Sequence, residues 1–129
     1  MDDCWKHHNH SHVIMTCGKS EVKVVVITGV SRGLGRAMAV EFASQGHRVI
    51  GCSRNEKKLS GLRKKLGDEH LLSVTDVVDD KAVAAWADES FQAFGAPDLL
   101  LNNAAVINRN KFLWELSASE FDEVVDINI

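Results

Sequence analysis

Four short segments of this chain are rich in consecutive hydrophobic residues. Val24-Val25-Val26-Ile27 is continuous, as a strand buried on both faces requires. Three later runs of similar length are also interpreted as strands: residues 48–52, 71–75 and 98–101. The longer segments between the runs leave room for a crossover helix after each strand. The pattern therefore predicts parallel strands.

Four segments between and after these runs have helical periodicity. The first ends near Gly46, at a position typical of a helix C-cap. The next three follow residues that commonly cap helix N-termini, namely Ser53 with Glu56, Asp79, and Ser117 with Glu120. The positions with helical spacing are Leu34, Met38 and Phe42; Leu59, Leu62 and Leu66; Val83, Trp86, Ala87, Ser90, Phe91 and Phe94; and Phe121, Val124, Val125 and Asn128.

Strands that alternate with helices predict an α/β fold with a parallel sheet and right-handed crossovers. In a doubly wound sheet the strand order is 3-2-1-4, and we expect this sheet to be truncated after about four strands. Residues 21–129 then form one partial domain. Residues 1–20 have neither helical nor strand periodicity, and we expect them to be a disordered, histidine-rich tail.

A glycine-rich turn separates the first strand from the first helix. Residues 28–35 read Thr-Gly-Val-Ser-Arg-Gly-Leu-Gly, a G-x3-G-x-G spacing. Glycine permits a tight turn and close approach of a phosphate, and the helix N-terminus offers free N–H groups and a positive dipole. An ordinary strand-to-helix turn is the alternative. The strand–turn–helix context favours a Rossmann-type site for the pyrophosphate of a dinucleotide.

The end of the second strand indicates which dinucleotide is preferred. A site for NAD usually has an acidic residue here, which binds the ribose 2′-hydroxyl. This chain instead reads Cys52-Ser53-Arg54, and Arg54 could bind a 2′-phosphate together with Arg32 of the glycine turn. Both arginines could also be solvated surface groups. Two cations without a carboxylate favour NADP.

Composition and charge argue against several other functions and locations. The net charge of -3 offers no broad basic surface for nucleic acid. No apolar run approaches the roughly 20 residues that cross a bilayer, and no secretory signal is evident. We therefore expect a cytoplasmic protein. The tail residues Cys4, His7, His8, His10, His12 and Cys17 could bind a metal ion, but their spacing fits no closed zinc site, and we expect no metal.

Four ordered segments resemble the short-chain dehydrogenase/reductase family. They are residues 28–35, which match the family's T-G-x3-G-x-G; Asp76-Val77; Asn102-Asn103-Ala104-Ala105, close to its N-N-A-G; and Asp126-Ile127-Asn128-Ile129. The resemblance covers residues 22–129, and residues 106–128 further resemble plant pterin aldehyde reductase-type members. It implies cofactor contacts from Thr28, Gly29, Ser31, Arg32, Gly33, Leu34, Gly35, Ser53, Arg54, Asp76, Val77, Asn103, Ala104 and Ala105.

Alternative roles are open for Asp76 and Asn103, and Ala105 departs from the family pattern. Asp76 would bind the adenine amino group, or would simply precede the helix cap at Asp79. Asn103 and its neighbour Asn102 would pair open backbone groups where strands diverge, or serve ordinary turn chemistry. Ala105 departs from the family's glycine and costs roughly 1 kcal/mol if a positive φ is needed there.

The resemblance implies an NADP-dependent oxidoreductase that acts on a small carbonyl or alcohol and forms homo-oligomers at full length. Asn128 would hold a water of the proton relay, or would simply be a polar residue at the end of its helix. On the apolar face of this helix it should also be buried. The family's proton donor is a tyrosine of a Tyr-x-x-x-Lys motif, and this chain has no tyrosine. We therefore expect a fragment that is inactive alone. A non-catalytic nucleotide-binding or regulatory module is the alternative.

Overall fold

The computed structural model describes residues 21–107 and 110–129. Its four strands are β1 (Val24–Thr28), β2 (Arg48–Ser53), β3 (Leu71–Val74) and β4 (Leu99–Leu101). All pairs of neighbouring strands are parallel, and their order is β3-β2-β1-β4. The predicted doubly wound order is confirmed. Residues 1–20, expected to be a disordered tail that binds no metal, lie outside the described residues.

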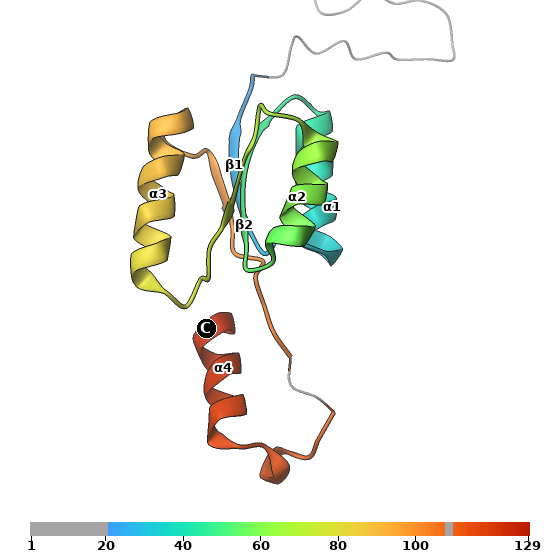
Figure 1. Ribbon diagram of the computed structural model, residues 1–129, viewed down its shortest axis with the longest axis vertical. Coiled ribbons are helices and arrows are strands. Elements are labelled where there is room, and N and C mark those ends of the chain that lie inside the picture. Colours follow the sequence, from blue (N-terminus) through green and yellow to red (C-terminus); the bar gives the residue numbers. More distant parts are fainter. Residues whose placement is uncertain (1–20, 108–109) are drawn as a thin grey trace, which may run out of the picture.

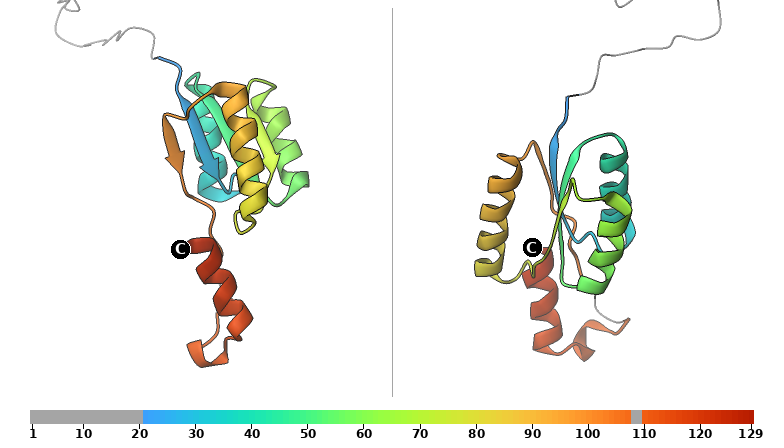
Figure 2. Two further views of the ribbon diagram at one scale, coloured as in Figure 1. Left: turned by 90° about the vertical axis from the view of Figure 1, so that its left-hand side faces the viewer. Right: turned by 45° about the horizontal axis from the view of Figure 1, so that its top comes forward.

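Helices cover both faces of this sheet (Figure 1). The α1 helix (Gly33–Ser44) and the α2 helix (Glu56–Leu66) lie on one face, and the α3 helix (Asp80–Phe94) lies on the other. The α4 helix (Ala118–Asn128) follows the short 3₁₀ helix η1 (Leu113–Glu115), which the sequence did not predict. Figure 1 and the left view of Figure 2 show α4 beyond the end of the sheet rather than against a face.

Alternate residues of the central strands build two cores. Val25 and Ile27 of β1 pack with Leu59 and Leu62 of α2, and all four side chains are at most 2% exposed. On the opposite face, Val26, Ile50 and Cys52 pack with Trp86 of α3. This arrangement explains the continuous apolar runs, because each central strand contributes to both cores.

The capping predictions are confirmed at two helices and wrong at one. Asp79 and Ser117 accept backbone hydrogen bonds at the starts of α3 and α4. Ser53, however, is the last residue of β2, and Asn55 caps α2 by accepting from the Lys58 N–H at 3.0 Å. The strand pairing of Ser53 with Val74 keeps Ser53 extended, so the helix begins two residues later than expected.

Several positions depart from the expected apolar faces, among them Phe91 of α3 and Phe121 of α4, which are 63% and 52% exposed. Leu34 is 68% exposed, because the first turn of α1 lies at the end of the sheet, whereas Met38 and Phe42 pack against the core as expected. β4 is an edge strand whose Leu99 and Leu100 are exposed. No helix in the described residues is long and apolar enough to span a membrane.

Candidate functional site

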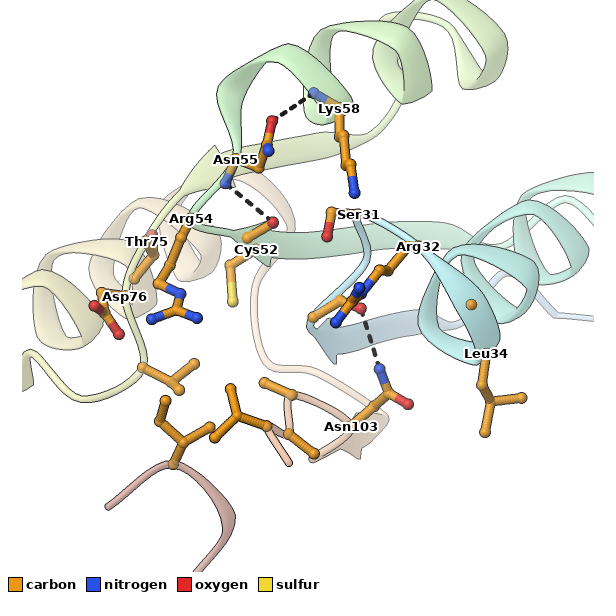
Figure 3. A pocket seen from close by; sticks show the side chains of 18 residues that line it. Ser31, Arg32, Leu34, Cys52, Arg54, Asn55, Lys58, Thr75, Asp76 and Asn103 are labelled. Atoms are coloured by element: carbon orange, nitrogen blue, oxygen red, sulfur yellow. Dashed lines mark hydrogen bonds between the residues drawn. The ribbon is translucent and has the colours of Figure 1, made fainter. Parts of the chain in front are cut away.

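A cavity of about 480 Å³ opens at the carboxyl end of the sheet, between the ends of β1, β2, β3 and β4 (Figure 3). In doubly wound folds, ligands bind at this edge where the chain order reverses, as it does between β1 and β4. Most residues that the sequence assigned to the cofactor line the cavity: Gly29, Ser31, Arg32, Gly33, Leu34, Ser53, Arg54, Asp76, Val77, Asn103, Ala104 and Ala105. Thr28 and Gly35 lie behind this surface.

The three glycines of the turn have different roles. A side chain at Gly29 would place its Cβ 2.8 Å from the Ala104 Cα, and a Cβ at Gly35 would collide with the Gly29 carbonyl and the Asn103 amide. Gly33 has a φ of +57° and no heavy atom within 4 Å of an added Cβ. Gly29 and Gly35 therefore allow the backbone to pack closely, and Gly33 leaves open space at the cavity wall.

Thr28 and Asn103 join the turn to the end of β4. The Thr28 Oγ1 accepts from the N–H groups of Asn103 and Ala104, both at 3.0 Å. The Asn103 amide donates to the carbonyls of Thr28 and Gly29 at 3.0 and 3.1 Å. The expectation that Asn103 pairs backbone groups where the strands diverge is confirmed. This network fixes the two loops that form one wall of the cavity.

The N-terminus of α1 differs from those of the other helices. Its N-cap is Arg32, whose side chain makes no capping hydrogen bond, and its first turn contains no acidic residue. In contrast, Asn55, Asp79 and Ser117 cap α2, α3 and α4 with side-chain oxygens. The first N–H groups of α1 and its positive dipole end are therefore available to an anion in the cavity.

Three cations surround the end of β2. Arg32 extends from the glycine turn, Arg54 follows β2, and Lys58 lies in the first turn of α2 (Figure 3). The Arg54 guanidinium lies 3.9 Å from the Glu123 carboxylate of α4, and both side chains are more than half exposed. The sequence predicted Arg32 and Arg54 but missed Lys58. A lysine four residues after Arg54 was the available signal.

Side chains from β2, β3 and α4 form the opposite wall. Thr75, Asp76 and Val77 follow β3, and Ile127 of α4 lines the cavity with them. The Asp76 Oδ1 accepts from the Val78 N–H at 3.2 Å. At the end of β2, burial raises the pKa of the Cys52 thiol. Cys52 lies under the cavity floor, where its completely buried side chain belongs to the core with Trp86.

Asn128 is not buried, contrary to the prediction. It is exposed, and none of the residues of α4 is buried, because this helix lies beyond the end of the sheet rather than against a face (Figure 1). Its side chain nevertheless makes two hydrogen bonds to Val106: the Oδ1 accepts from the Val106 N–H at 2.9 Å and the amide donates to the carbonyl at 2.8 Å. Asn128 thus connects α4 to the loop after β4, and Val106 itself lines the cavity.

Comparison with known proteins identifies this arrangement. A family model described as short chain dehydrogenase matches residues 23–129. The chain belongs to the short-chain dehydrogenase family. An NADPH-dependent pterin aldehyde reductase of Arabidopsis thaliana is 46% identical over 109 residues, which are 83% of this chain and 45% of that protein. The reductase FabG of Haemophilus influenzae, which acts on 3-oxoacyl-[acyl-carrier-protein], is 33% identical over 83% of this chain and 44% of its own length.

Solved structures of the family share the fold. A 3-ketoacyl-(acyl-carrier-protein) reductase from Brucella melitensis, complexed with NADH, superposes with a TM-score of 0.80 at 30% identity, over 83% of this chain and 44% of that one. A metagenomic short-chain oxidoreductase in complex with NADP gives a TM-score of 0.78 at 31% identity, over 87% and 52%. The chain therefore spans about half the length of these relatives.

Proposed function

We propose that this chain is the cofactor-binding part of an NADP-dependent oxidoreductase, which transfers hydride between a nicotinamide and a carbonyl or alcohol. One observation carries the choice of cofactor: Arg32 and Arg54 line the cavity at the end of β2, where residues 52–54 include no carboxylate. A ribose 2′-hydroxyl needs an acceptor at this point, and a 2′-phosphate needs cations. The family relatives bind either dinucleotide, so the local charge supports NADP.

The residues of the cavity suit the parts of such a cofactor. The α1 N-terminus and the open space at Gly33 would receive the pyrophosphate, since both lie on the same wall. Asp76 and Val77 would contact the adenine ring, and Asn103, Ala104 and Ala105 would support the nicotinamide ribose. When bound, the cofactor supplies the hydride. The chain's own residues bind and orient it.

The substrate is proposed from similarity alone. The relative at 46% identity is named for reduction of a pterin aldehyde with NADPH, which makes a small aromatic aldehyde the first candidate. Asn128 would contribute to catalysis by holding a water near the nicotinamide, through the same loop that Val106 anchors.

Proton donation needs a residue that the 129 residues do not contain. The proposed mechanism uses a tyrosine as the acid, and the chain has none. We infer that residues 1–129 alone bind the cofactor without reducing a carbonyl.

Titration with NADPH and NADH tests the cofactor choice. We expect wild type to bind NADPH at least about tenfold more tightly, and Arg54→Met to lose most of this preference, because a charge-assisted bond contributes about 1.5–3 kcal/mol. Arg36→Met is the matched control, since Arg36 lies on α1 but does not line the cavity. Equal affinity for both dinucleotides in wild type would refute the proposal.

A further inference from the structure

Lys58 is a cation of the cavity that sequence reasoning did not assign to the cofactor. It lies in the first turn of α2 and lines the cavity with Ser31 and Arg32. Figure 3 shows its side chain extending from α2 toward Ser31 of the glycine turn. Lys58 therefore reaches from the helix after β2 toward the helix after β1, across the side of the cavity where the cations gather.

The start of α2 determines the direction in which the Lys58 side chain extends. The Asn55 side chain accepts from the Lys58 N–H at 3.0 Å, so the backbone of the first turn is held in place. In an α-helix the Cα–Cβ bonds tilt toward the N-terminus. A long side chain in the first turn consequently reaches beyond the helix start, which here means the end of β2 and the mouth of the cavity.

A lysine at this position works against the helix that carries it. The N-terminal end of a helix dipole is positive, and a cation in the first turn is unfavourable there by a few tenths of a kcal/mol. Glu56 at the first position of α2 offsets part of this effect. Residues that oppose local preference are concentrated at functional sites, and an anion held between Lys58 and the helix start would remove the conflict.

The neighbouring cation is already engaged. Arg54 lies 3.9 Å from Glu123, which would compete with a ligand phosphate for the guanidinium. In residues 21–107 and 110–129, no ion pair within 4.0 Å involves Lys58. The Lys58 ammonium can therefore meet a phosphate without first leaving a carboxylate.

We infer that Lys58 is a third cationic contact to the 2′-phosphate of the dinucleotide, in addition to Arg32 and Arg54, and that it contributes to discrimination between phosphorylated and unphosphorylated ribose. The inference rests on the proposed function, because it requires a 2′-phosphate at the end of β2. It assigns to Lys58 a role in binding and specificity, with no part in hydride or proton transfer.

Calorimetric titration of the purified protein with two fragments of the cofactor tests this role. Adenosine 2′,5′-bisphosphate carries the additional phosphate, and adenosine 5′-monophosphate does not. We expect Lys58→Met to weaken binding of the bisphosphate about tenfold, as expected for loss of one charge-assisted contact, and to leave the monophosphate unchanged. Lys57→Met is the matched control, because Lys57 is the adjacent exposed lysine and does not line the cavity. Lys58→Arg should restore most of the affinity.

The outcomes separate the two proposals. If wild type prefers the bisphosphate and Lys58→Met behaves like Lys57→Met, the role of Lys58 is refuted and NADP dependence stands. If wild type binds both fragments equally, NADP dependence fails and the role of Lys58 fails with it. Unchanged thermal unfolding of Lys58→Met assigns any loss of affinity to the missing ammonium.

Discussion

The two ends of the described chain are held in place by different forces. β1 and β2 with α1 and α2 enclose a core in which Ile27, Leu59 and Leu62 are completely buried. α4 has no buried residue, and its Phe121 is 52% exposed. Polar contacts connect it to the loops at the end of the sheet, namely two hydrogen bonds between Asn128 and Val106 and the distant pair of Arg54 with Glu123.

The two regions should therefore contribute differently to the stability of the fold and to the shape of the cavity. Burial of apolar surface supplies most of the free energy of folding, whereas exposed hydrogen bonds and ion pairs supply little. The first region should therefore determine whether the chain folds. α4 should determine the shape of one cavity wall, through Ile127 and through the loop held at Val106.

The largest expected effect is in the core. Leu62→Ala should lower the free energy of unfolding by about 3 kcal/mol, because it removes a completely buried side chain and leaves a cavity between α2 and the sheet. Chemical denaturation monitored by circular dichroism measures this change. Phe121→Ala on α4 is the comparison, and we expect less than about 0.5 kcal/mol there, as for exposed surface positions. Equal losses would show that α4 is packed in solution.

A smaller, local effect is expected from Asn128→Ala. The substitution removes both hydrogen bonds to Val106, so the loop after β4 should open more often while the core is unaffected. Amide exchange at Val106 should accelerate about fivefold to tenfold, which corresponds to a net hydrogen-bond contribution of about 1 kcal/mol. Asp126→Asn on the same helix should leave this rate unchanged. An unchanged rate in Asn128→Ala would refute the connection.

The smallest expected effect concerns the start of α4. The pKa of the Glu120 carboxyl is lowered to about 2, first by the Ser117 backbone N–H and then by the Lys111 ammonium and the Ser117 hydroxyl. Because this folded pKa is depressed, the capping contact is fully present above the ordinary value of 4.5 and is lost as the pH falls toward 2.

NMR titration of the Glu120 carboxyl measures this directly. Lys111→Met should move the pKa part of the way back toward the ordinary value, while the chemical shifts of the core remain unchanged. An ordinary pKa for Glu120 in the wild-type protein would mean that the capping box does not persist in solution.

Local sequence predicted much of the architecture. The continuous run at residues 24–27 and the turn at residues 28–35 placed the candidate nucleotide site, and the strand order 3-2-1-4 followed from alternating elements. The caps Asp79 and Ser117 were also predictable, since capping depends on hydrogen bonds within one helical turn.

Tertiary structure decided the remainder. Ser53 does not cap α2, because strand pairing with β3 keeps it extended. The burial of Asn128 was wrongly predicted, because periodicity identifies an apolar face without showing what covers it. Lys58 and Glu123 became relevant only when folding brought Lys58 to the cavity and Glu123 to within 3.9 Å of Arg54. Periodicity, turns and caps depend on neighbouring residues in the chain, so they can be predicted from the sequence. Side chains that are distant in the sequence come together only when the helices and strands pack, so their proximity is seen only in the folded structure.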